Sequence, residues 1–210
     1  PREDIDWNNF TLRQRGRMLY MSSPVATSAI NTNRTKVVGV GLTLKSSVDR
    51  EVLGISPEAA KEWQRRTEAE FSLWARNKAN CDATGMNNFY GMQQLALVAW
   101  LQSGDVFPVF KRRNPTPVNP YSLRIHLVEA DRVRTPAEYG GGTAVAHITD
   151  GKNPENGNRI FDGVEVDNDS MVVAYYVHNT YPWQTTTEPT KWTRVEAYGP
   201  RTGLPNILHI

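Results

Sequence analysis

Two acidic residues near the middle of the chain have the spacing of a paired-carboxylate site. Glu129 and Asp131 follow the apolar run 123–128, and two positions apart on a strand they project from the same face. Carboxylates placed in this way bind a divalent cation or raise one another's pKa for acid–base work. Asp105 is a further candidate carboxylate, but no additional acidic residue or base completes a catalytic set. We therefore favour a turn in which Asp131 accepts backbone N–H bonds.

One dense basic cluster stands directly before a proline-rich turn. It consists of Lys111, Arg112 and Arg113. At a hairpin tip such a cluster can contact phosphate groups without sequence preference, and each contact adds salt dependence. A solvated turn and contact with an acidic neighbouring subunit are the alternatives. A looser basic series near the start has the same standing, namely Arg13, Arg15 and Arg17.

The other residue types that carry chemistry are isolated. The four histidines, at His126, His147, His178 and His209, have no partner at the spacing of metal ligands, so no metal site is expected. Cys81 has only Lys78 as a nearby cation, so we do not expect a nucleophile. Gly39-Val40-Gly41 lacks the third glycine of a dinucleotide fingerprint and is expected to serve packing. The sequence thus predicts no enzyme and no cofactor.

An aromatic-rich segment stands near the end of the chain. Tyr181, Trp183, Trp192 and Tyr198 flank the threonines at 185–187. Such a segment can form an interface, or it can cover the edge of an antiparallel sheet. The loop from Ala137 to Asn158 has no apolar pattern, and loops of this length are usually functional or mobile.

The first half of the chain has the patterns of helices. Helices are expected at 8–20, 23–33 and 56–77, because Ser-Pro pairs at 23–24 and 56–57 combine an N-cap with proline at the first helical position. Residues 35–43 are expected to form a strand, whose two glycines suggest a bulge or a close backbone approach. The helix at 89–101 is apolar almost all round, which predicts that it is buried on every side.

The second half of the chain changes to the alternating pattern of strands. Extended segments are expected at 106–110, 123–133, 164–166 and 171–178. Helices followed by antiparallel strands indicate an α+β fold, with the N-terminal helices packed on a largely antiparallel sheet or partial barrel. We expect a mainly helical part at 1–104 and a β-rich part at 105–210, together forming one compact unit.

Composition sets outer bounds on what the chain can be. Its 210 residues are 39% hydrophobic and 22% charged, with six tryptophans, as in an ordered globular protein. The net charge of +2 is too small to indicate nucleic-acid binding by itself. A single cysteine excludes a disulfide framework, and no apolar run reaches bilayer length. The chain begins without Met and ends on the apolar run 206–210, so we expect a piece of a longer protein.

Several of these segments, in this order, resemble the portal proteins of lambda-type tailed phages. In that family a helix ending in Trp-Leu-x-x-Gly-(Asp/Glu)-x-Phe leads to a strand ending in (Ile/Val)-Glu-Ala-Asp-Arg-(Val/Leu). The matching residues here are Trp100, Leu101, Gly104, Asp105, Phe107, Glu129, Ala130, Asp131, Arg132 and Val133. Further matches are Pro24-x-Ala26, Val37-Val38-Gly39-x-Gly41, Cys81-Asp82-Ala83-x-Gly85, Phe89-Tyr90-Gly91, Asn158-Arg159-Ile160, Gly163–Asp167 and Val173–Val177.

The resemblance covers about residues 10–210 and departs from the family pattern at two places. Ser22-Ser23 stands where the family usually has paired Asn, and Met171-Val172 stands where a proline turn often precedes the strand. The family also continues past the Leu-His-Ile end into helices that carry most of the DNA tunnel and of the motor-docking surface.

The resemblance implies a structural protein of the virion. Portals form a ring, typically of twelve subunits, at one capsid vertex. The ring docks the large terminase subunit, passes double-stranded DNA without sequence preference, and joins the capsid to head–tail connector proteins. It would act in the host cytoplasm during assembly or from a prophage, with no membrane partner, and this chain would form the portal wing. Two alternatives remain at this point: a metal-dependent nuclease or hydrolase using Glu129 and Asp131, and a nucleic-acid-binding module of a mobile element.

Overall fold

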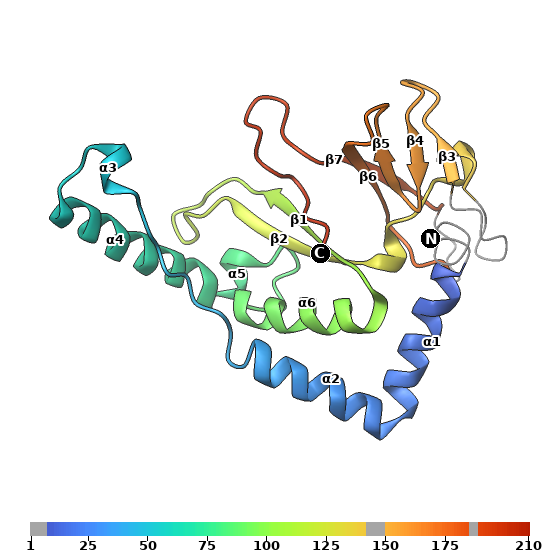
Figure 1. The fold of residues 1–210 in the computed structure, drawn as a ribbon, viewed down its shortest axis with the longest axis horizontal. Coiled ribbons are helices and arrows are strands. Elements are labelled where there is room, and N and C mark those ends of the chain that lie inside the picture. The colour runs from blue at the N-terminus through green and yellow to red at the C-terminus, as the bar shows by residue number, and fades with distance from the viewer. Residues whose placement is uncertain (1–7, 142–149, 185–188) are drawn as a thin grey trace. The chain divides into compact units, whose positions relative to one another are not determined.

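The computed structural model describes residues 8–141, 150–184 and 189–210 (Figure 1). The helices are α1 (Asn9–Ser22), α2 (Pro24–Val37), α3 (Arg50–Leu53), α4 (Pro57–Arg76), α5 (Lys78–Cys81) and α6 (Phe89–Ser103), with short 3-10 helices η2 (Ala130–Arg132) and η3 (Ala137–Tyr139). The strands are β1 (Val106–Arg112), β2 (Leu123–Glu129), β3 (Asp150–Lys152), β4 (Arg159–Phe161), β5 (Val164–Val166), β6 (Val172–His178) and β7 (Trp192–Glu196).

The α+β prediction is confirmed. Strands β1 and β2 pair in a two-stranded sheet, and β3 to β7 form a five-stranded antiparallel sheet in chain order. In the part of the chain that the structure describes, the larger sheet is open at β3 and β7, so it does not close into a barrel. None of the described helices combines the length and hydrophobicity that a bilayer span requires.

The chain divides into two compact units that interleave along the sequence. Unit 1 takes residues from 1–32, 98–110 and 127–210, and unit 2 consists of 33–97 and 111–126. The α-helices precede the strands along the chain. Each unit nevertheless collects segments from both halves, because strands β1 and β2 contribute residues to both units.

Unit 1 contains the five-stranded sheet and the main apolar core. The core residues are Phe107, Val109, Val128, Ala130, Val133, Tyr175, Ala197 and Ile207. The apolar run at 206–210 lies along β1, where the backbone of Ile210 exchanges hydrogen bonds with that of Val106 at 3.0 and 3.1 Å. Apolar side chains of β1 and of the run 206–210 therefore pack into the same core.

A two-residue turn connects β4 to β5. Its residues, Asp162 and Gly163, both have positive φ, at 44° and 83°, as a tight hairpin turn requires. A Cβ atom at Gly163 would lie 2.4 Å from the backbone nitrogen of Arg134. The glycine of the Gly-Val-Glu-Val-Asp segment is therefore required both by the turn and by the chain that crosses it.

Unit 2 contains the most regular helix, α4. The Ser56 hydroxyl accepts a hydrogen bond from the Ala59 nitrogen at 3.2 Å, with Pro57 at the first helical position. The predicted helix at 56–77 is thus confirmed, cap included. Its aromatic face packs through Trp74, whose ring centroid lies 5.3 Å from that of Phe89 and whose indole N–H donates to the Leu123 carbonyl.

The strand expected at 35–43 is wrong. Helix α2 continues to Val37, and the chain then turns and runs without regular structure. The left-handed Gly39 (φ 56°) ends the helix, with its N–H bonded to the Arg34 carbonyl, as glycine often does at a helix C-terminus. The close approach expected at the glycines occurs at Gly41, where a Cβ atom would lie 2.4 Å from the Tyr90 ring.

The helix α6 forms as predicted, but the prediction that it is buried on every side is wrong. Its buried residues are Met92 and Ser103, whereas Leu95, Trp100 and Leu101 are 46%, 47% and 39% exposed. An apolar pattern predicts that a helix is buried, but it does not distinguish burial within its own chain from burial against a partner. Much of α6 is left uncovered by the described residues.

Candidate functional site

Helix α1 brings two arginines to the acidic residues that stand out in the sequence. Arg13 and Arg17 are four positions apart, so they lie on one face of the helix. Both face carboxylates of unit 1: Arg13 those of Asp105 and Asp162, and Arg17 those of Glu129 and Asp131. We call this group of six residues the α1 ion-pair cluster.

The first half of the α1 ion-pair cluster centres on Arg13, which is buried. Its Nη2 lies 3.1 Å from Asp105 Oδ2 and 3.2 Å from Asp162 Oδ2. The other oxygen of Asp105 accepts a hydrogen bond from His209 Nε2 at 3.1 Å. Burial alone would raise the pKa of Asp105, but the hydrogen bond from His209 and the charge of Arg13 outweigh it and lower that pKa. Asp105 is therefore held as an anion that joins α1 to the residue after Gly104.

The second half of the α1 ion-pair cluster centres on Arg17. Its Nη2 lies 2.8 Å from Glu129 Oε2 and also contacts the carboxylate of Asp131. Asp131 is buried whereas Glu129 is half exposed. Burial raises the pKa of Asp131, although the charges of Arg17 and Arg13 oppose that shift. The spacing of Glu129 and Asp131 does bring two carboxylates together, but around an arginine.

This arrangement leaves little room for the metal-dependent hydrolase alternative. The guanidinium of Arg17 stands between Glu129 and Asp131, in the place that a divalent cation would have to take. No group of three or more His, Cys, Asp or Glu side chains within the described residues is placed to hold a metal ion. The arrangement is that of an internal ion pair, which joins α1 to the end of β2 and to η2.

The favoured turn interpretation is confirmed for the backbone and corrected for the side chain. Residues Ala130–Arg132 form the 3-10 helix η2 directly after β2. The Asp131 carboxylate accepts no backbone hydrogen bond there; its partner is Arg17. The sequence pattern of Arg13, Arg15 and Arg17 as a basic series does not predict this pairing. Their spacing of four residues on a predicted helix was the available signal.

Two aromatic residues cover the Arg17 half of the α1 ion-pair cluster. The rings of Tyr181 and Trp183 stack with centroids 5.3 Å apart. The Trp183 ring lies 4.9 Å from the Arg17 guanidinium carbon, and the Tyr181 hydroxyl donates to Glu129 Oε1 at 3.2 Å. Both rings thus cover an ion pair. The threonines at 185–187, which these aromatics were expected to flank, lie outside the described residues.

The other aromatic residues of that segment belong to the sheet and its rim. Trp192 begins β7, the edge strand, and its indole N–H donates to Glu138 at 2.6 Å. Its ring packs edge-on against those of Tyr139 and Tyr176. Tyr198 is exposed. Of the two alternatives for this segment, Trp192 fits the second: it covers the edge of the antiparallel sheet.

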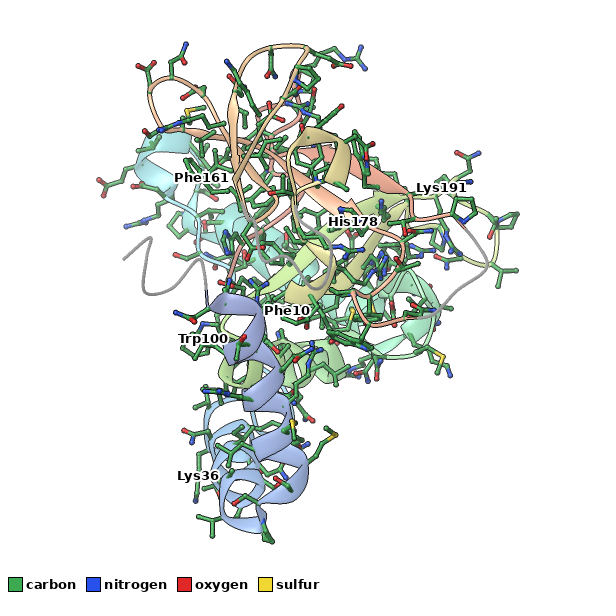
Figure 2. The ribbon with its side chains drawn as sticks, turned by 90° about the vertical axis from the view of Figure 1, so that its right-hand side faces the viewer. Phe10, Lys36, Trp100, Phe161, His178 and Lys191 are labelled. Carbon is green, nitrogen blue, oxygen red and sulfur yellow. The ribbon has the colours of Figure 1, made fainter. Side chains whose placement is uncertain are left out.

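The remaining signature residues have structural positions. Arg132 donates from Nε to the His178 carbonyl at 2.9 Å, and Gly104 takes a left-handed conformation (φ 89°) at the end of α6. Figure 2 shows His178 at the end of β6 and the exposed Trp100 on α6. Arg132 thus links the end of β2 to the end of β6, and Gly104 ends α6. Neither residue contacts a reactive side chain among the described contacts.

Among the described residues, the histidines and the cysteine are not brought together into a reactive group. His178 is buried, and burial lowers its pKa to about 4. His209 pairs with Asp105, His126 belongs to unit 2, and His147 lies outside the described residues. Cys81 is fully buried, and burial followed by the charge of Asp82 raises its pKa. A thiol of that kind is a poor nucleophile.

The basic cluster at 111–113 lies where β1 leaves its sheet. Lys111 and Arg112 are the last residues of the strand, and the backbone of Arg113 pairs with that of Ser122 across the start of the connecting loop. All three side chains are exposed. The Arg113 side chain donates to the Ala83 carbonyl at 2.9 Å. The cluster thus lies at the end of the strand, ahead of the turn at 116–119 in which the backbones of Thr116 and Asn119 pair.

A buried glutamate that sequence reasoning missed lies in the larger sheet. Glu165 lies between two valines on β5, and it is completely buried. Its two oxygens accept hydrogen bonds from Arg194, Tyr176, Asn156 and Asn158 at 2.7 to 3.1 Å. The sequence feature that could have indicated this burial is the group of three asparagines in the preceding loop, Asn153, Asn156 and Asn158. Their amides can donate to a buried carboxylate.

Comparison with known proteins agrees with this architectural reading. The family model of the phage portal protein, lambda family, matches residues 1–210. A probable portal protein of Halomonas phage phiHAP-1 is 28% identical over 173 residues, which cover 82% of this chain and 29% of that relative. The chain thus spans less than a third of the length of this curated relative. Because the family model matches the chain from end to end, this chain belongs to the lambda family of phage portal proteins.

Proposed function

We propose that this chain is the wing part of a portal subunit, and that the complete protein forms a ring of twelve subunits at one vertex of the capsid. The ring would be the conduit for double-stranded DNA during packaging and ejection. It would also be the docking site for the large terminase subunit and for the head–tail connector proteins. The match of the family model over residues 1–210 is the observation that carries this proposal.

The surface of unit 1 supports a role in assembly. Helix α1 and the first turn of α2 expose a series of large apolar side chains, namely Met18, Leu19, Met21 and Val25. Exposed apolar residues in such number mark interaction surfaces. A subunit in a closed ring buries two different surfaces against its two neighbours, and this series together with the exposed residues of α6 suits such contacts.

The ion-pair cluster of α1 supports the same role. It fixes the helix that carries the exposed apolar residues to the turns around Asp105, Asp162 and Asp131. A surface presented by a fixed helix loses less conformational freedom when it binds a partner. The cluster would therefore orient an assembly surface, and the absence of a reactive group in it fits that task.

Electron microscopy of the full-length gene product tests the proposal directly. Rings with a central channel are expected, and class averages would give the subunit number. Particles that remain monomeric at concentrations used for capsid assembly would contradict it. Docking is tested separately, by measuring whether immobilised rings capture the large terminase subunit encoded by the same phage.

A further inference from the structure

The loop between β3 and β4 contains the one Asn-Gly pair of the sequence, Asn156-Gly157. Such a pair is chemically reactive, because the glycine nitrogen, which no side chain shields, can attack the side-chain carbonyl carbon of the preceding asparagine. The backbone nevertheless requires the glycine, since Gly157 takes the left-handed conformation (φ 76°) that glycine adopts without steric cost. The loop therefore contains a reactive pair that the rest of the fold must hold in check.

Three hydrogen bonds oppose the attack in the folded chain. The Gly157 N–H, which carries the attacking nitrogen, donates to the Asn153 carbonyl at 2.8 Å. The Asn156 side chain accepts at Oδ1 from the Asn158 backbone nitrogen at 2.9 Å and donates from Nδ2 to Glu165 Oε1 at 2.7 Å. Because both reacting groups are held by other partners, the reaction requires that the loop first leaves Glu165.

Glu165 is the anchor of this loop in the larger sheet. It is completely buried, its Oε2 lies 2.8 Å from Arg194 Nε, and the Tyr176 hydroxyl donates to the same oxygen at 2.7 Å. Asn156 and Gly157, in contrast, are exposed. An exposed loop can open locally while the strands beneath it stay folded. The hydrogen bonds to Glu165 therefore determine how often the reactive pair is released.

We propose that Asn156 is a site of covalent modification by deamidation, and that its contact with Glu165 controls the reaction. In the open loop the Gly157 nitrogen forms a bond to Asn156 Cγ. The bond from Cγ to Nδ2 breaks, and that nitrogen leaves as ammonia with the proton of the Gly157 amide. Water then opens the cyclic imide at one of its two carbonyl carbons, which gives aspartate or isoaspartate.

The product cannot restore the original contact. A carboxylate at position 156 has no N–H to donate, and it would bring a second negative charge next to the buried Glu165, whose charge already pairs with Arg194. Like charges repel strongly where water is excluded. Isoaspartate would in addition lengthen the backbone of a tight loop. One opening of the loop between β3 and β4 is thereby converted into a permanent loss of its anchor on β5.

The test measures conversion of Asn156 in the full-length protein, incubated at mildly alkaline pH and physiological temperature with and without urea. Trypsin cleaves after Lys152 and Arg159, and mass spectrometry of the peptide 153–159 locates the gain in mass that accompanies the change from amide to carboxylate. Asn158, which precedes an arginine, is the internal reference. We expect the folded chain to convert at least about tenfold more slowly than the chain in urea, as for a group that reacts only after local opening.

Variants of the anchor separate its contribution from that of the sequence. Tyr176→Phe removes one donor to Glu165 and keeps the ring, so conversion in the folded chain should become several times faster. Tyr198→Phe is the matched control, because Tyr198 is exposed, and it should convert at the wild-type rate. Since Tyr176→Phe can weaken the whole chain, Asn158→Ala removes another donor to Glu165 from the loop itself and should act in the same direction.

Equal rates with and without urea would overturn the inference, and so would the absence of conversion in urea. Wild-type rates in both Tyr176→Phe and Asn158→Ala would show that Glu165 does not control the reaction. The consequence is tested with Asn156→Asp, which reproduces one product and should lower the melting temperature. Asn168→Asp, on an exposed residue of the turn after β5, is the control; equal melting temperatures of the two variants would overturn the predicted loss of the anchor.

Discussion

Arg194 donates to both oxygens of the completely buried Glu165, from Nε at 2.8 Å and from Nη2 at 3.1 Å. The pair links the edge strand β7 to β5, two strands away across the sheet. The same carboxylate accepts from the loop between β3 and β4 through Asn156 and Asn158. One anion thus holds three parts of the larger sheet together.

The substitution Glu165→Gln should strongly destabilise the chain. It leaves the Arg194 guanidinium without its counter-charge and turns one accepting oxygen into a donor that faces other donors. Removing one partner of a buried ion pair costs roughly 3–5 kcal/mol. Urea unfolding followed by tryptophan fluorescence measures the loss. Glu62→Gln on the exposed face of α4 is the control and should change the free energy of unfolding by less than about 0.5 kcal/mol; equal effects of the two substitutions would show that Glu165 does not hold the sheet.

Acid should weaken the fold in two separate steps. Burial and the charge of Arg134 lower the pKa of His178 to about 4 from a usual 6.5. The unfolded chain therefore takes up a proton as the pH falls below about 6.5 while the folded chain does not, so stability is lost down to pH 4. This step amounts to about 3 kcal/mol.

The second step belongs to Glu165. Burial by itself would raise its pKa, but the hydrogen bonds from Arg194 and Tyr176 prevail and lower it to about 2 from a usual 4.5. The stability that this carboxylate contributes is complete above pH 4.5 and is lost as the pH falls toward 2. Free energies of unfolding at intervals between pH 7 and pH 3 resolve both steps. The His178→Gln variant keeps a donor for the Arg134 carbonyl, so it should lose the step above pH 4.5 and retain the lower one; a wild-type curve that is flat from pH 6.5 to 4.5 would contradict the assignment to His178.

The pattern of the sequence predicts those elements whose signal is local. The cap at Ser56-Pro57 and the spacing of Trp63, Phe71 and Trp74 define α4, because both depend only on neighbours along the chain. The strand expected at 35–43 has no such support. Its alternating valines are also compatible with the end of a helix, and two positive-φ glycines decide between the two outcomes.

The site was harder to predict than the fold because its partners are distant in sequence. The spacing of Glu129 and Asp131 indicates that two carboxylates are close, but their cation, Arg17, comes from a helix more than a hundred residues earlier. Glu165 is similar, since its cation, Arg194, lies on another strand. Local pattern gives no information about which distant charge completes a pair.

Removing the cation from the α1 ion-pair cluster should destabilise the helix that carries the exposed apolar residues. The substitution Arg17→Met leaves the buried Asp131 without its main counter-charge, at a cost of about 2–4 kcal/mol. Arg15→Met is the control, since Arg15 is exposed on the same helix. The second change Asp131→Asn should restore part of the loss, and a double variant as unstable as the sum of both single variants would show that the two residues do not interact.

The turn between β4 and β5 provides a test of backbone geometry. Gly163 and Gly203 both have positive φ, at 83° and 66°. A methyl group at Gly203 meets open space, whereas at Gly163 it would lie 2.4 Å from the Arg134 backbone nitrogen. Gly203→Ala should therefore cost about 1 kcal/mol from left-handed strain alone. Gly163→Ala adds a clash with backbone that cannot rotate away, so its cost should exceed about 3 kcal/mol. Thermal unfolding of the two variants measures the difference, and equal melting temperatures would mean that the crossing chain at Arg134 yields to the added methyl group.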